Sequence, residues 1–204
     1  MARRSAADKA ETHERIIERA ARAFREYGSG VGIGDVMKDL GLTHGGFYRH
    51  FGSKDDLLVE AIARSLDEVT ERFDRIAEAA PPGKELEAII TAYLSADHLR
   101  HPETWCALAT LAPDIGRQPA AIRKRVDASL QRYMARMAKY MPGETEDERR
   151  RTFVILFSGM AGAMALTRAC GDKDMRERVL DTTRDYYLAT FAGAGGQQAA
   201  RRTR

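Results

Sequence analysis

The stretch that decides the fold of this 204-residue chain is GLTHGGFYRHFGSKDDLL, residues 41–58. Phe47 and Phe51 stand four positions apart, so on a helix both rings point to the same side, toward a core. The segment before it, residues 34–40, has helical spacing of its apolar residues and is followed by a glycine. Two short helices joined by a three-residue turn, residues 41–43, form a helix-turn-helix pattern.

The second of these helices carries a polar surface opposite its two phenylalanines. Thr43 can cap its start with the side-chain hydroxyl group. Gly45 and Gly46 in the first turn each cost about 1 kcal/mol of helix propensity. Glycines here would allow the helix backbone to come close to a ligand such as DNA, which would explain why they are present despite that cost. The alternative explanation is that this part of the chain is loosely packed.

The positive charge of the chain gathers around this motif. Residues 1–54 contain ten Lys and Arg residues against seven acids, whereas residues 55–204 contain 23 of each, so the formal net charge of +3 is N-terminal. Residues 40–54 contain no Asp or Glu but hold Arg49, Lys54 and two histidines. Such a surface is expected to face phosphate groups, and chance composition is the alternative.

The rest of the chain also has the three- and four-residue apolar spacing of helices, with almost no alternating β-branched runs. Ser53 and Thr145, each with an acid three residues later, predict capped helix starts. We therefore predict an all-α fold with no sheet. The nine predicted helices cover residues 5–27, 34–40, 43–50, 53–80, 84–98, 102–115, 119–141, 146–170 and 173–191.

The helix-turn-helix region resembles the TetR/AcrR family of bacterial transcriptional regulators. The resemblance lies in Tyr48, His50, Phe51, Lys54 and Leu57, which follow the helix pair in the spacing typical of that family. It runs from the ERIIERAARAFREYG stretch of the first helix to residue 58, and beyond it only the helical architecture is similar. The resemblance implies a DNA-binding domain at residues 1–53 and a ligand-binding and dimerisation domain at residues 54–192. Residues 193–204 have low-complexity composition, which predicts a disordered tail.

The resemblance also implies that the second short helix lies in the major groove of double-stranded operator DNA. His44 would then face base edges, Tyr48 a thymine methyl group or a phosphate, and Arg49 either kind of group. The candidate DNA-binding residues are Thr43, His44, Gly45, Gly46, Tyr48, Arg49, His50 and Lys54. Gly32 and Gly34 depart from the family pattern, which puts base contacts from the first helix of the pair in doubt.

Regulators with this motif usually bind DNA as dimers, which requires a self-complementary apolar surface. The last two predicted helices carry more apolar residues than one internal face needs, although a buried hairpin within one subunit is the alternative. The candidate residues for a homodimer interface are Phe153, Phe157, Met164, Val179, Tyr186, Tyr187 and Phe191.

The resemblance further implies a pocket for a small apolar or aromatic effector, and plain core is the alternative for each lining residue. The candidates are Phe73, Tyr93, His98, Trp105, Cys106, Tyr133, Met137 and Met160. Cys106 also supports the hypothesis of a thiol sensor for electrophiles, against the alternative of a buried, inert cysteine.

Other classes of protein fit the sequence less well. Cys106 and Cys170 form no Cys/His cluster, so we expect no metal site and no disulfide framework. The spacing of Gly28, Gly30, Gly32 and Gly34 does not match a phosphate-binding loop, so we expect no cofactor. The chain has no secretory signal at its start, and the apolar stretch 153–166 is too short to cross a bilayer, so we expect a cytoplasmic protein without a membrane partner. A helical adaptor that binds a protein, and an enzyme built around Cys106, are the alternatives to a DNA-binding regulator.

Overall fold

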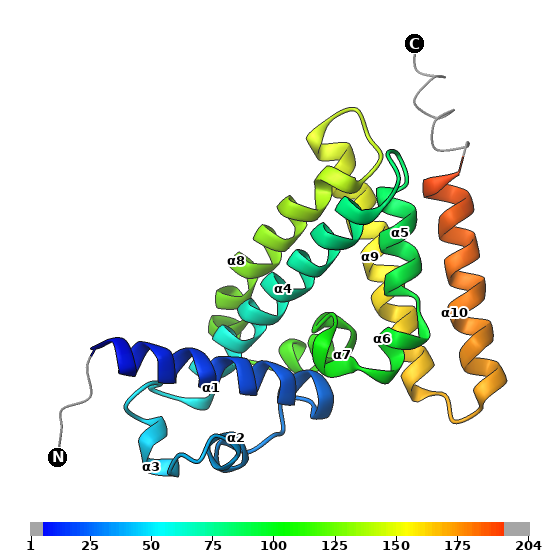
Figure 1. Ribbon diagram of the computed structural model, residues 1–204. Helices are drawn as coiled ribbons and strands as arrows, with labels where there is room; N and C mark the ends of the chain where they lie inside the picture. The colour runs from blue at the N-terminus through cyan, green and yellow to red at the C-terminus, as the bar shows by residue number, and fades with distance from the viewer. Residues whose placement is uncertain (1–5, 194–204) are drawn as a thin grey trace. The chain divides into compact units, whose positions relative to one another are not determined.

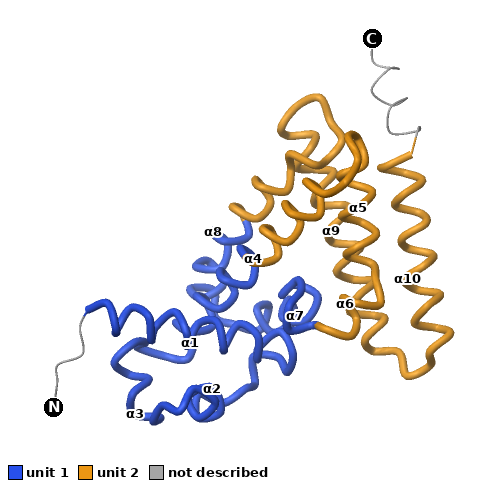
Figure 2. The backbone as a smooth tube through the Cα atoms, in the orientation of Figure 1, with its two compact units in different colours: residues 1–67, 102–130 blue, residues 68–101, 131–204 orange. Residues whose placement is uncertain are grey.

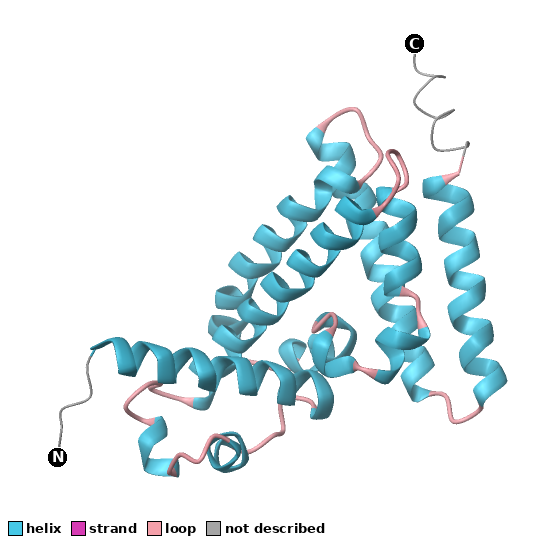
Figure 3. Ribbon diagram, in the orientation of Figure 1, coloured by secondary structure: helices cyan, strands magenta, loops and turns pink. Residues whose placement is uncertain are grey.

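The computed structural model describes residues 6–193, and its helices are joined by loops, with no strand in that range (Figure 3). The predicted all-α fold is confirmed. Ten α-helices and three short 3-10 or π turns follow one another along these residues (Figure 1). The predicted disordered tail lies, apart from Gly193, outside the described residues.

The chain forms two compact units (Figure 2). Unit 1 consists of residues 1–67 and 102–130, and unit 2 of residues 68–101 and 131–204. The predicted division between residues 53 and 54 concerns function and stays a prediction.

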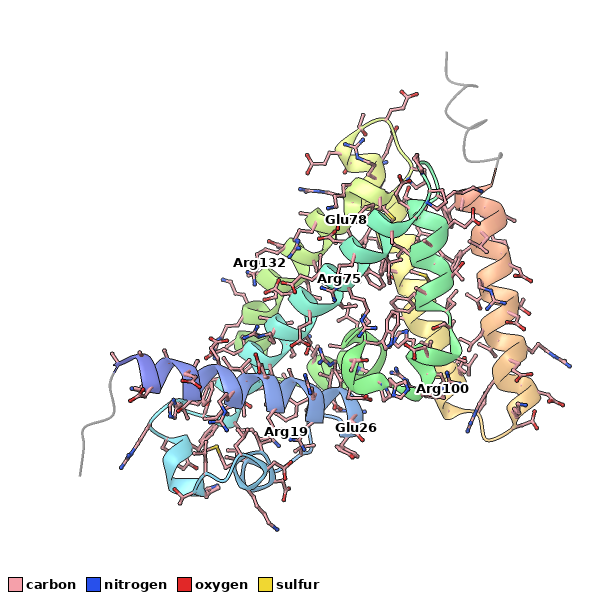
Figure 4. All side chains as sticks on the ribbon, viewed as in Figure 1. Arg19, Glu26, Arg75, Glu78, Arg100 and Arg132 are labelled. Carbon is pink, nitrogen blue, oxygen red and sulfur yellow. The ribbon has the colours of Figure 1, made fainter. Side chains whose placement is uncertain are left out.

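Unit 1 holds the helix-turn-helix pair. Its elements are α1 (Ala6–Tyr27), α2 (Ile33–Asp39), α3 (His44–Phe47), the first part of α4 (Lys54–Ala79), η1 (Pro102–Thr104), α7 (Leu108–Gly116) and the start of α8 (Ala120–Met137). In Figure 4, Arg19 reaches from α1 toward α2, where its Nε donates a hydrogen bond of 2.8 Å to Asp39. The buried Arg25 joins α1 to η1 by donating from Nε to the carbonyl oxygen of Glu103 at 2.6 Å. Segment 102–116 therefore packs on α1 although it lies far from it in sequence.

Unit 2 holds an aromatic core. Its elements are the rest of α4 and α8, α5 (Glu85–Tyr93), α6 (Ala96–Arg100), η2 (Ala138–Tyr140), α9 (Glu146–Ala169), α10 (Lys173–Tyr187) and η3 (Leu188–Ala192). The rings of Phe73, Tyr93, Tyr133, Phe153 and Phe157 contact one another with centroids 4.5 to 6.0 Å apart. Helix α10 lies beside α9 (Figure 1).

Two predicted helices are interrupted in the structure. The helix predicted over 84–98 is two helices, because Ser95 turns extended and its side chain accepts the backbone N–H of His98 to start α6. The helix predicted over 102–115 begins instead with the 3-10 turn η1, and α7 starts only at Leu108. At α9 the predicted capping box of Thr145 and Glu148 is present.

Helix α9 has the predicted bounds to within one residue and is strongly apolar over its second half. Its 24 residues reach the length and composition of a membrane-crossing helix, and 33% of its most apolar window is buried inside the structure. The expectation that this region is too short concerned residues 153–166, and the window that reaches this length also includes residues on either side of them. Core helices of soluble proteins have the same composition, so the finding is weak evidence for a membrane span.

Candidate nucleic-acid interface

The turn between α2 and α3 is built as the sequence predicts. Gly41 has φ +67°, a conformation that favours glycine. The backbone N–H of Leu42 returns to the carbonyl of Met37 at 2.9 Å, which closes the turn. Thr43 is extended, and its hydroxyl oxygen accepts the N–H of Gly46 at 3.2 Å, so the predicted cap of α3 is present.

Helix α3 has one side in the core and one side in solvent. Phe47 and Phe51 are buried and stacked, with centroids 5.2 Å apart, as their spacing predicts. On the other side, Tyr48 is 61% exposed and makes an edge contact with His44, with centroids 5.9 Å apart. The structure thus places all eight candidate DNA-binding residues on α3, its cap, the turn after it and the start of α4. Of these, Thr43, His44, Gly45, Tyr48 and Arg49 are exposed, whereas Gly46, His50 and Lys54 are half-buried.

A groove runs along α3. It has a volume of about 540 Å³ and is lined by Thr12, Met37, Gly41, Leu42, Thr43, Gly45, Gly46, Arg49 and His50. A Cβ atom added at Gly45 would meet nothing within 4 Å, so no contact within the protein requires a glycine there. The missing side chains leave the backbone of α3 open to a ligand.

At the start of α4 one of the two acids, Asp56, is engaged in hydrogen bonds and an ion pair. The Ser53 hydroxyl oxygen accepts the N–H of Asp56 at 3.1 Å, which caps the helix as predicted. The Asp56 carboxylate accepts hydrogen bonds from the Ser53 hydroxyl and from Arg125 of α8, and these interactions lower the pKa of Asp56. The Asp56 charge is therefore neutralised beside Lys54.

Sequence reasoning missed two residues of α1 that contact this region. Thr12 lines the groove. The ring of His13 stacks on Phe51, with centroids 4.5 Å apart. No local spacing could reveal either contact, because both join α1 to a segment some thirty residues or more further along.

Comparison with known proteins is consistent with this geometry. Residues 16–61 match the model of bacterial regulatory proteins of the tetR family. They span most of α1, both helices of the pair and the start of α4.

Residues 16–61 are the part of the chain that is similar to the TetR family.

Curated relatives support the assignment over the N-terminal part. A probable HTH-type transcriptional regulator, ArpR of Pseudomonas putida, is 36% identical over 90 residues, which are 44% of this chain and 41% of the relative. The HTH-type transcriptional regulator TtgR of Pseudomonas putida is 36% identical over 80 residues, 39% of this chain and 38% of the relative. The matches span less than half the length of these relatives.

Solved structures share the fold over nearly the whole chain. A TetR transcriptional regulator from Chloroflexus aurantiacus superposes with a TM-score of 0.69 at 23% identity, over 91% of this chain and 98% of that one. A regulator from Saccharomonospora viridis, solved in complex with choline, has a TM-score of 0.67 at 17% identity, over 90% and 99% of the two chains. At these identities the likeness concerns the fold alone.

The candidate effector-binding residues fall into two groups. Phe73, Tyr93, His98, Tyr133, Met137 and Met160 lie in unit 2, and all six are buried. His98 is in edge contact with Tyr93 at 4.6 Å and its Nδ1 is 2.7 Å from the Tyr93 carbonyl oxygen. Burial lowers the pKa of His98 to about 3, so its ring is neutral at pH 7. The other two candidates, Trp105 and Cys106, lie in unit 1.

The thiol of Cys106 is inaccessible in this structure. Its residue is 1% exposed, and reaction with an electrophile requires exposure of the thiolate. A sensor role therefore requires a second conformation in which Cys106 reaches solvent.

The candidate dimer residues differ in how far they are exposed. Phe153, Phe157 and Met164 are buried within the subunit, which corrects their placement on an interface. Val179, Tyr187 and Phe191 are half-buried, and Tyr186 is 64% exposed. The apolar side chains that α9 leaves in solvent are Val154, Ile155 and Leu166.

Proposed function

We propose that this protein is a transcriptional regulator that binds operator DNA through α3 and releases it when a small molecule binds. The observation that carries the proposal is an exposed, acid-free surface formed by His44 of α3 and by Tyr48 and Arg49 directly after it, with Phe47 anchoring α3 in the core. In helix-turn-helix proteins such a helix enters the major groove and contacts base edges from its N-terminal half.

The candidate DNA-binding side chains fall into those that suit bases and those that suit phosphates. His44 and Tyr48 form one exposed aromatic pair that can contact base edges and a thymine methyl group. Arg49, His50 and Lys54 suit phosphate oxygens, which fix the position of the protein on the duplex. Gly45 and Gly46 allow the backbone of α3 to come close to the bases.

We infer that the protein acts as a homodimer on a palindromic operator, because a two-fold dimer presents two copies of α3 to two half-sites. The supporting feature is the apolar strip of α9 that faces solvent, formed by Val154, Ile155 and Leu166. Tyr186 of α10 adds an exposed ring. Burial of such side chains between two copies is favourable by about 25 cal/mol per Å² of apolar surface.

The effector we infer is a small apolar or aromatic molecule that enters the aromatic core of unit 2. The Saccharomonospora viridis regulator of the same fold holds a small molecule, choline. Binding can release DNA only if the effector has unequal affinity for the DNA-bound and free conformations. We infer that the protein represses transcription, since most members of the family do. We also infer that it lies in the cytoplasm, because bacterial DNA is there.

The test is fluorescence anisotropy of the purified protein with labelled DNA from upstream of its own gene, titrated with salt. We expect sequence-dependent binding that Tyr48→Ala weakens. Lys54→Ala should make the dependence on salt shallower, by about 0.9 in log–log slope for each phosphate that is no longer neutralised. Binding that is equally weak for all DNA and unaffected by either change contradicts the proposal.

The same salt titration separates the alternative of a helical adaptor. Counterion release makes DNA binding fall steeply with salt, whereas an apolar protein interface shows little change. The alternative of a thiol enzyme has no support from Cys106, which is buried.

A further inference from the structure

We propose that His13 is a positioning residue for DNA recognition: from α1 it fixes the end of α3 and so sets how His44 and Tyr48 are presented. This inference rests on the proposed function of α3.

The first observation is a continuous stack of three rings. The His13 ring lies on Phe51 with centroids 4.5 Å apart and planes inclined by 18°. Phe51 lies on Phe47 with centroids 5.2 Å apart and planes inclined by 21°. Both phenylalanines are buried, so the position of the His13 ring is passed on to α3 through closely packed side chains.

The second observation is that α4 holds the His13 ring in place. His13 Nε2 lies 2.8 Å from Oε2 of Glu60, 47 residues away in sequence. One turn further along α4, Arg64 forms an ion pair with Glu14, the neighbour of His13. The ring is therefore fixed from two directions, by the hydrogen bond to α4 and by the stack on Phe51.

The third observation is that α3 cannot fix its own orientation. It has four residues, and a helix so short is stable only through tertiary contacts. The Thr43 cap fixes the start of α3, and the stack of His13, Phe51 and Phe47 fixes its C-terminal end. The His13 side chain is 27% exposed, so it lies at the edge of the core and can be changed without opening a large internal cavity.

Removal of the ring is expected to affect base readout more than attraction to phosphate. Base readout depends on the exact placement of side chains, whereas phosphate attraction depends mainly on charge. The cations of this surface, Arg49 and Lys54, are unchanged by a substitution at His13. An aromatic pair is worth roughly two- to tenfold in an equilibrium constant.

The experiment compares wild type with His13→Ala, His13→Phe and the matched control His101→Ala, which removes an exposed histidine of unit 2. Each variant is titrated with two duplexes: the DNA from upstream of the protein's own gene, and a shuffled sequence of equal length. All variants are measured at the same pH and below the melting temperature of every variant. For His13→Ala we expect five- to tenfold weaker binding of the upstream DNA, with unchanged affinity for shuffled DNA and an unchanged salt slope.

His13→Phe keeps the stack and is expected to stay within about threefold of wild type, like the control. If His13→Ala discriminates as wild type does, or binds both duplexes more weakly by the same factor, the inference is overturned while the proposed function stands. If the wild-type protein itself does not prefer its upstream DNA, the proposed function fails, and this inference fails with it.

Discussion

Replacement of Gly45 by alanine separates the needs of the fold from the needs of DNA binding. Gly45 lies in α3, is exposed, and has open space within 4 Å of where a Cβ atom would stand. Alanine is favoured over glycine in a helix by about 1 kcal/mol. For a chain of this size, that free energy of unfolding corresponds to a melting temperature higher by roughly 2–4 °C.

The same methyl group is expected to weaken DNA binding. It projects from the surface of α3 that we place against the bases, and it holds the backbone away from them. Removal of one good base interaction costs about 1–3 kcal/mol, which is roughly five- to 150-fold in affinity. A protein that becomes more stable and binds DNA less tightly cannot owe its weaker binding to misfolding.

The assay pairs thermal unfolding with fluorescence anisotropy on the upstream DNA. The matched control is Gly116→Ala at the end of α7, where a Cβ atom also meets nothing within 4 Å. The control should leave DNA affinity unchanged. Unchanged affinity in Gly45→Ala would refute the close approach of the α3 backbone to DNA, and a lower melting temperature would refute the local steric argument.

Three further changes test other parts of the structure. In Gly159→Ala the new Cβ atom would clash with the Tyr187 hydroxyl group, so that side chain must move. The variant should therefore gain less stability in thermal or urea unfolding than the roughly 1 kcal/mol by which alanine is favoured over glycine in a helix, and the full gain should appear in a Tyr187→Ala background. Ile155→Lys should shift the protein from dimer to monomer in analytical ultracentrifugation, and an unshifted dimer would place the interface elsewhere. Asp56 has a pKa below its ordinary value of 3.8, so the stability from its interactions with Ser53 and Arg125 is complete above that value and disappears as the pH falls through the lowered pKa. The difference in unfolding free energy between wild type and Asp56→Asn should therefore be constant near pH 7 and shrink in acid, and a pH-independent difference would contradict this linkage.

The sequence alone determined the features that depend on neighbours within one helical turn. The cap of α3 by Thr43, the capping box at Thr145 and the inward pair Phe47 and Phe51 are all present. Each follows from interactions between residues three or four positions apart, which the order of residues states directly.

Only the tertiary structure decided which face of an apolar helix is buried. Over residues 153–166 helix α9 is apolar on nearly every side, so periodicity could not show that Phe153 faces the core and Ile155 faces solvent. The contacts of His13 with Phe51 and Glu60 likewise join residues far apart in sequence. Such contacts depend on how whole helices pack, and packing is a property of the folded chain that local spacing does not contain.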